Sequence, residues 1–422
     1  MSGEPVLQLF EAILTAEVYN QTPCLDMNDL PPVYRKLFGF NGDTGEVKRP
    51  VVVSEGAIQR VLGIAGAHEH LKNNPFIGYE EFGQRLSISA LEPAARWFFK
   101  MGGEKYAVKN PTLACFMETL KIGPSLYAAS REKNPPVEDS RPYLDSKLGG
   151  VLKQDGALKD ALDLVIVSAP DEIEQSLDTL VCTSAQKETI AKIRTAVRYQ
   201  EYLRDRRIYE LGKLLFVGPP GTGKTSLALA LSHELHMPVL EVRLSMITSQ
   251  YLGETSKNID RIFQFAKKMA PCILFIDEFD FVAKSRVTDD HGAMKRAVNM
   301  LLKNIDRVSL VRDQVLLIGA TNHPQLLDEA AWRRFDDIIE FTLPDESVRR
   351  DILKGLLSQF ECECDPGKLA AETEGFSGAD LRVMVKEGVL ASLARDSSRI
   401  ESQDVEKGLT LIRNRNAIRQ IR

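Results

Sequence analysis

Beyond about Ser176, short runs of β-branched and apolar residues alternate with longer stretches of helical periodicity. This alternation is typical of repeated βα units, in which each helix returns the chain to the same end of the sheet and the strands become parallel. Five runs predict strands: Leu214 to Val217, Val239 to Arg243, Cys272 to Ile276, Val315 to Ile318 and Ile338 to Phe341. We therefore predict an α/β domain over residues 176–344 with a parallel five-stranded sheet.

Strand-like runs cease after Pro344. Helices are expected at Asp351 to Phe360, Gly378 to Ala394 and Ser402 to Leu411, which predicts a small helical subdomain over residues 345–422. The end of the chain, from Arg413 to Arg422, is basic without nearby acids. It is therefore either a solvated tail or a contact to a neighbouring subunit.

Residues 1–134 predict a separate, mainly helical N-terminal domain. Helical spacing of apolar residues occurs at Val6 to Val18, Ala57 to Leu62, Ala90 to Met101 and Pro111 to Ser130. The proline-rich stretch from Asn134 to Pro142 indicates a boundary, so we expect a linker over residues 135–175. The aromatic residues 97–99 belong either to the core of this domain or to a substrate-binding surface.

Composition narrows the function classes. The chain has 422 residues, with 54 Lys and Arg against 59 Asp and Glu, a net charge of −5 and 44% hydrophobic residues. This balance excludes a disordered chain and gives no overall attraction to nucleic acid or to anionic lipid. The six cysteines are scattered, and no apolar run approaches the roughly 18 residues of a spanning helix. We expect a cytoplasmic protein in a reducing compartment, with no membrane span and no structural metal.

The segment from Gly218 to Thr225 fits the phosphate-loop pattern G-x-x-x-x-G-K-[ST], between a predicted strand and a predicted helix. Backbone N–H groups at the helix start favour phosphate, the lysine adds a positive charge, and Thr225 offers a hydroxyl to Mg²⁺. The alternative is a chance glycine-rich turn. We predict a P-loop NTPase that binds ATP through Gly218, Pro219, Pro220, Gly221, Thr222, Gly223, Lys224, Thr225 and Ser226.

About fifty residues later, an apolar run ends in Asp277 and Glu278. Both acids are expected at the carboxyl edge of a buried strand beside the phosphate loop. There Asp277 is suited to the Mg²⁺ shell and Glu278 to polarising the attacking water, although two acids also suit a simple strand cap. An acid aimed at water predicts hydrolysis of ATP.

From about Ser176 to Leu411 the sequence resembles the AAA ATPases, the group with proteasomal ATPases, katanin, spastin, vacuolar-sorting ATPases and ubiquitin-directed segregases. The motifs are Leu177 to Val181, Leu317 to Asn322, Leu327 to Phe335 and Gly375 to Leu381. The resemblance implies that Val181 and Cys182 border the adenine, although Cys182 stands where the family usually has glycine. It also implies that Asn322 senses the γ-phosphate, that Gly378 and Ala379 contact the nucleotide, and that residues 345–422 form a lid.

The same resemblance implies a hexameric ring. Arg333 and Arg334 occupy the family's arginine-finger segment, which acts on the ATP of the next subunit, unless Asp336 and Asp337 pair with them. Tyr251, Leu252 and Gly253 match the first pore loop, which grips polypeptide in the channel.

On this basis we predict a protein-remodelling motor whose N-terminal domain selects protein substrates or adaptors. One alternative is a nucleic-acid-remodelling ATPase, which the acidic charge disfavours while the basic tail keeps it open. The other is an ATP-gated assembly protein that hydrolyses slowly.

Overall fold

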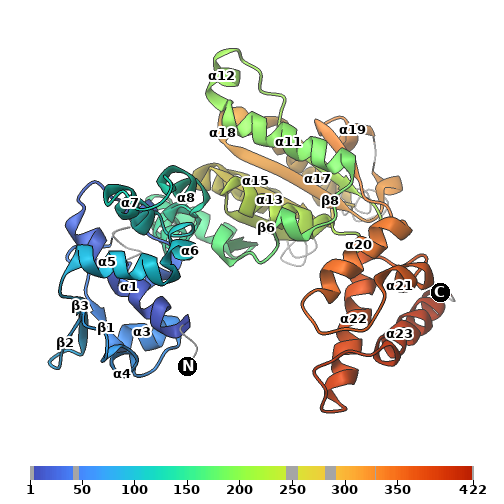
Figure 1. The fold of residues 1–422 in the computed structure, drawn as a ribbon. Helices are drawn as coiled ribbons and strands as arrows, with labels where there is room; N and C mark the ends of the chain where they lie inside the picture. The colour runs from blue at the N-terminus through green and yellow to red at the C-terminus, as the bar shows by residue number, and fades with distance from the viewer. Residues whose placement is uncertain (1–3, 41–46, 244–254, 281–290, 328, 421–422) are drawn as a thin grey trace. The chain divides into compact units, whose positions relative to one another are not determined.

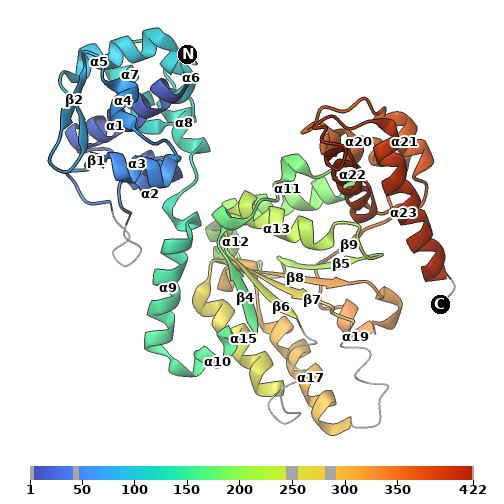
Figure 2. The same ribbon diagram turned by 90° about the horizontal axis from the view of Figure 1, so that it is seen from below.

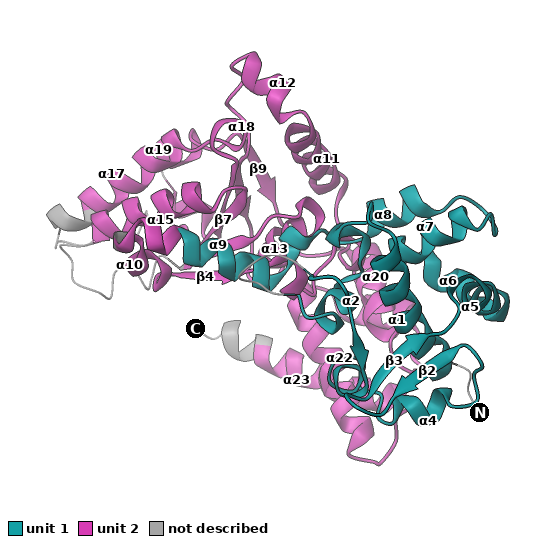
Figure 3. Cartoon of the chain, turned by 90° about the vertical axis from the view of Figure 1, so that its left-hand side faces the viewer, with its two compact units in different colours: residues 1–150 teal, residues 151–422 magenta. Residues whose placement is uncertain are grey.

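The computed structural model describes residues 4–40, 47–243, 255–280, 291–327 and 329–420. It divides the chain into two compact units, residues 1–150 and residues 151–422 (Figure 3). The helices that the structure describes include none with both the length and the apolar character needed to span a bilayer.

Unit 1 is mainly helical, as predicted (Figure 1). A three-stranded antiparallel sheet of order β1-β3-β2 was not expected, because strands of two to four residues are too short to show an alternating pattern. Its elements are α1 Glu4–Gln21, α2 Pro32–Leu37, β1 Val53–Ser54, α3 Glu55–Leu62, α4 Ala67–Leu71, β2 Ile77–Glu80, β3 Arg85–Ile88, α5 Leu91–Phe98, α6 Glu104–Ala107, α7 Pro111–Thr119, α8 Tyr127–Lys133 and most of α9 Arg141–Gln154.

Helix α1 runs through the core of unit 1. Phe10 is fully buried, and its ring centroid lies 4.8 Å from that of Trp97 and 5.6 Å from that of Phe98. Phe98 and Phe99 are themselves buried. The aromatic residues 97–99 are therefore core residues, which removes the alternative of a substrate-binding surface at this point.

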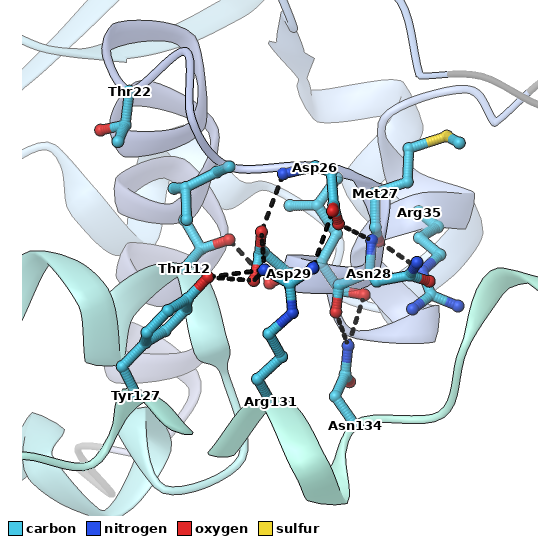
Figure 4. A network of polar contacts seen from close by, with 12 residues as sticks. Thr22, Asp26, Met27, Asn28, Asp29, Arg35, Thr112, Tyr127, Arg131 and Asn134 are labelled. Atoms are coloured by element: carbon cyan, nitrogen blue, oxygen red, sulfur yellow. Dashed lines mark hydrogen bonds and ion pairs between the residues drawn. The ribbon is translucent and has the colours of Figure 1, made fainter. Parts of the chain in front are cut away.

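A buried carboxylate connects helix α8 to the loop that follows α1 (Figure 4). Asp29 is fully buried, accepts a hydrogen bond from the Tyr127 hydroxyl at 2.9 Å, and forms an ion pair with Arg131 at 3.1 Å. The Asn134 side chain donates to the Asn28 carbonyl at 2.7 Å. These bonds satisfy a charge that would otherwise be costly to bury, and they hold α8 and the following residues within unit 1.

Unit 2 contains a six-stranded sheet of order β4-β6-β7-β8-β5-β9, seen in Figure 2. Its strands are β4 Val165–Ser168, β5 Lys213–Val217, β6 Val239–Arg243, β7 Cys272–Asp277, β8 Val315–Thr321 and β9 Asp337–Glu340. Its helices are α10 Lys159–Leu162, α11 Ser184–Arg198, α12 Gln200–Asp205, α13 Lys224–Leu235, α15 Thr255–Met269, α17 His291–Arg307, α18 Leu310–Asp313, α19 Glu329–Trp332, α20 Glu346–Leu357, α21 Pro366–Glu372, α22 Gly378–Leu393 and α23 Ser402–Gln420.

The five predicted strands are present and parallel, but β4 adds a sixth that runs antiparallel to β6, with Val165 opposite Val242. Residues 135–175, which we expected to be a linker, contain this strand and all of α9. A four-residue edge strand paired on one side needs no long apolar run, so its sequence signal is weak.

The described part of the helical lid has four helices, α20 to α23, where three were predicted. Helix α21 was missed because it is only seven residues long. The lid has its own core, in which Leu353, Leu381 and Met384 are fully buried. Cys362 and Cys364, in the loop between α20 and α21, are paired as a disulfide, which the expected reducing compartment did not predict.

Candidate nucleotide-binding site

The phosphate loop joins β5 to α13, and its glycines are required by its path. Gly218 has φ +145°, and a Cβ at this position would lie 1.9 Å from the Phe341 carbonyl oxygen. Gly221 has φ +78°, and a Cβ there would lie 2.7 Å from the Ser377 hydroxyl. Gly223, with φ +100°, immediately precedes α13. The loop thus presents the positive end of a twelve-residue helix, which is suited to an anion.

Lys224 is the first residue of α13, and its ammonium group is held against the loop. The Nζ atom donates to the carbonyls of Gly218 and Pro219, each at 2.8 Å. Burial lowers the pKa of Lys224 to about 8, and the nearby Asp277 carboxylate acts in the opposite direction. Added negative charge from phosphate would favour the charged form of this lysine. The residues present therefore fit a phosphate chain.

The other residues of the predicted phosphate loop are also arranged in a way that suits phosphate and Mg²⁺. The Thr222 hydroxyl donates to the Pro219 carbonyl at 2.8 Å, which closes the turn. Thr225 and Ser226 lie half-buried in the first turn of α13. Hydroxyl and carboxylate oxygens are ligands that Mg²⁺ accepts, so Thr225 and Asp277 form a suitable donor set for that ion.

Asp277 ends β7, and the chain turns sharply after it. Glu278 adopts φ +54°, an uncommon conformation for a residue with a side chain, and its N–H donates to Asp277 Oδ1 at 2.8 Å. The next residue, Phe279, is buried, and its N–H donates to the Ala320 carbonyl on β8 at 2.8 Å. With Phe279 held in the core, the turn leaves the Glu278 side chain exposed. Strained backbone of this kind is frequent at functional sites.

Strand β8 lies between β5 and β7, so the carboxyl ends of all three meet at one edge of the sheet. The Gly218 N–H donates to the Thr321 carbonyl at 3.3 Å, and Asn322 follows, half-buried. The Thr321 hydroxyl donates to the buried Asp280 at 3.2 Å. Sequence reasoning did not single out Asp280 or Thr321, although a third acid close behind Asp277 was a visible signal.

Arg333 and Arg334 follow α19 and have different surroundings. The Arg333 side chain is 72% exposed and forms an ion pair with Glu329. The Arg334 side chain is 26% exposed, with its Nε 3.1 Å from an Asp306 oxygen, and it also donates to the Ala330 carbonyl. Arg333 is therefore the more accessible of the two guanidinium groups.

The predicted alternative, in which the arginines pair with the two following acids, finds no support in these contacts. Asp337 instead forms an ion pair with Lys192 on α11 at 2.7 Å. Asp336 accepts a hydrogen bond from the Lys213 backbone N–H at 3.0 Å, and burial raises the pKa of its carboxyl. Both acids therefore have other partners.

The lid contacts the phosphate loop directly. Helix α22 begins with a capping box in which Ser377 and Asp380 satisfy each other's backbone N–H groups. The Ala379 N–H donates to the Gly221 carbonyl at 3.1 Å, and Gly378 adjoins the same carbonyl. The predicted nucleotide contacts Gly378 and Ala379 thus lie beside the loop that is expected to bind phosphate.

The roles predicted for the adenine-contact residues and for the pore-loop residues remain predictions. Cys182 is half-buried against the core of the sheet, and burial raises the pKa of its thiol, while Val181 is exposed. The preceding turn, Leu177–Thr179, packs against α13. The pore-loop residues Tyr251, Leu252 and Gly253 lie outside the described residues.

Comparisons with known proteins agree with this geometry. Residues 214–343 match the ATPase family associated with various cellular activities (AAA), and residues 364–407 match the AAA+ lid domain. An uncharacterized AAA family ATPase of Sinorhizobium fredii is 33% identical over 239 residues, which is 56% of this chain and 71% of that protein. The chain therefore belongs to the AAA family of ATPases.

Other relatives match over a smaller share of their own length. Spastin of Ixodes scapularis is 33% identical over 325 residues, 73% of this chain and 50% of spastin. A 26S proteasome regulatory subunit homologue of Methanothermobacter marburgensis is 34% identical over 228 residues, 53% of this chain and 61% of the homologue. The crystal structure of the FIGL-1 AAA domain shares the fold, with a TM-score of 0.52, 24% identity and coverage of 62% of this chain and 91% of that domain.

Proposed function

We propose that this ATPase is a protein-remodelling motor of the cytoplasm that works as a homohexameric ring and draws polypeptide past Tyr251, Leu252 and Gly253. The observation that carries the proposal is the hydrogen bond from Ala379 in the lid to Gly221 in the phosphate loop. A change at the phosphates would alter this contact and so move the lid. Such coupling is what a motor requires, and the proposal is supported by the similarity to spastin and to a proteasome regulatory subunit homologue.

The residues of one chain divide the chemistry between them. Backbone N–H groups from Gly218 to Ser226 and the Lys224 ammonium group would hold the phosphates, and Thr225 with Asp277 would hold Mg²⁺, which neutralises phosphate charge when bound. Glu278, exposed at the end of β7, would take a proton from the attacking water. Asn322, at the adjacent strand end, would orient the same water.

A second chain would complete the site. Arg333 is exposed, and its ion-pair partner among the described residues is Glu329 at i−4, so it can be released at little cost to reach the γ-phosphate of a neighbour. Arg334 makes more contacts within its own chain and is better suited to fixing the end of α19. Arg333 is therefore the more suitable finger.

Residues 1–134 would select protein substrates or adaptors. They fold mainly into helices with their own core, as an independent recognition domain requires. Remodelling of nucleic acid is the second candidate function, and the Arg-rich helix α23 is what favours it. The chain's net charge of −5 weighs against it.

Replacing Tyr251 tests the proposed grip on polypeptide. We expect Tyr251→Ala, placed in the hydrolysis-deficient Glu278→Gln background with ATP, to bind fluorescently labelled casein at least tenfold more weakly, because the aromatic contact is lost. In an otherwise native chain, Tyr251→Ala should retain ATP turnover. Fluorescence anisotropy measures the first quantity and phosphate release the second.

Tyr251→Phe is the matched control, because it keeps the aromatic face and should bind casein as Tyr251 does. Equal casein affinity for the Ala and Phe variants would refute the pore-loop grip.

A further inference from the structure

A cleft of about 410 Å³ opens between the phosphate loop and the lid. The loop contributes Pro219 and Gly221, the start of α22 contributes Ala379 and Asp380, and Arg415 comes from helix α23. The arginine lies 32 positions after Val383, the nearest other lining residue in the sequence. Only the folding of α23 back along α22 brings it to the cleft.

The position of α23 is well fixed close to this arginine. Ile412 is fully buried in the lid core, and Arg413 donates to the Glu372 carbonyl on α21 at 2.9 Å. These two contacts hold the helix just before residue 415. The location of Arg415 at the cleft therefore follows from packing of the helix that carries it.

The charged groups around the cleft leave Arg415 available. Asp380 is the acid that lines the cleft, and its Oδ2 accepts hydrogen bonds from the Ser377 N–H at 3.0 Å and hydroxyl at 2.7 Å. Lys224 donates to the loop carbonyls instead. Among the described residues, Arg415 forms no ion pair, and its exposed side chain lines the cleft beside a loop suited to phosphate.

We propose that Arg415 is a nucleotide-contact residue, which binds the phosphate chain of the nucleotide held in the same chain. A guanidinium is always charged and offers several donors, so it suits phosphate oxygens better than a neutral polar group does. The charged residue that lines the cleft at the start of α22 is an acid, Asp380. A cation at the phosphates would therefore come from α23. This assignment rests on the ATP site and not on the ring or on threading.

The role also links the end of the chain to the nucleotide. Helix α23 packs along α22, whose first turn already donates to Gly221. The phosphate loop thus contacts the lid through α22, and a bound phosphate chain would contact it through Arg415 on α23. Loss of a phosphate would release the contact to α23.

The test is the affinity of the full-length chain for fluorescently labelled ADP. We expect Arg415→Gln to raise the Kd about tenfold, in the range of a hydrogen bond to a charged group, and to flatten the dependence of Kd on salt. Adenosine affinity should be unchanged, because adenosine has no phosphate. The Kd of Arg415→Lys for ADP should lie between those of the native chain and Arg415→Gln.

Arg382→Gln is the matched control. Arg382 is exposed on α22 and does not line the cleft, so its substitution removes the same charge away from the proposed site. It should bind ADP as the native chain does. An ADP affinity of Arg415→Gln within twofold of the native value would overturn the proposal. Equal weakening of ADP and adenosine would also overturn it, because that result indicates a change of cleft shape. A failure of the Tyr251 experiment would leave this test unaffected.

Discussion

Glu278→Gln is expected to lower ATP turnover by about 10²- to 10⁴-fold, the usual contribution of a positioned general base. The amide keeps the size of the side chain but cannot accept the proton of the attacking water. Nucleotide affinity should remain within about threefold, because the phosphate loop and Asp277 are unchanged. Steady-state phosphate release measures turnover, and equilibrium binding of ATP measures affinity.

Glu340→Gln provides the control for this substitution. Glu340 lies exposed at the end of β9, so its substitution makes the same chemical change at another strand of the same sheet. It should leave turnover within twofold. Turnover by Glu278→Gln at more than a tenth of the native rate would show that another group activates the water.

Gly218→Ala is expected to destabilise unit 2 by about 3 kcal/mol, since overpacking and backbone strain both act at this position. Its new Cβ would overlap the Phe341 carbonyl oxygen, only 1.9 Å away, and φ is +145°. The loop must shift to relieve this overlap, so ATP binding should fall at least a hundredfold. Urea unfolding and ATP titration check the two effects.

Gly375→Ala separates backbone strain from steric overlap. Gly375 has φ +79°, but its Cβ would meet no atom within 4 Å. We expect it to cost about 1 kcal/mol, the strain of a left-handed residue with a side chain. If Gly218→Ala were no more destabilising than Gly375→Ala, the close approach of the loop to Phe341 would not limit the sequence here.

The central sheet could be predicted because its signal is local. Four of the five parallel strands, β5 to β8, are mainly apolar and largely buried, whereas β9 buries only Ile339; each run predicted its strand to within a few residues. Edge strand β4, Val165–Ser168, has only one neighbour and gave too little signal. The short strands of unit 1 were missed because two to four residues are too few to show an alternating pattern.

Those parts of the candidate site that are defined by the spacing of residues along the chain could be predicted from the sequence. The interval from Gly218 to Thr225 identified the phosphate loop, and the acids ending β7 identified the neighbouring edge of the sheet. Partners created by tertiary folding were not predictable. Neither the ion pair of Arg334 with Asp306 nor the approach of Arg415 to the loop has any local sequence signal.

The mass of the ATP-bound assembly tests the central claim, that this ATPase works as a ring. Glu278→Gln with ATP, measured by light scattering after size-exclusion chromatography, is predicted to have six times the mass of the monomer. Lys224→Ala, which loses the phosphate-binding ammonium group, should remain smaller under the same conditions. A monomer or dimer of Glu278→Gln at saturating ATP and tens of micromolar protein would contradict the account.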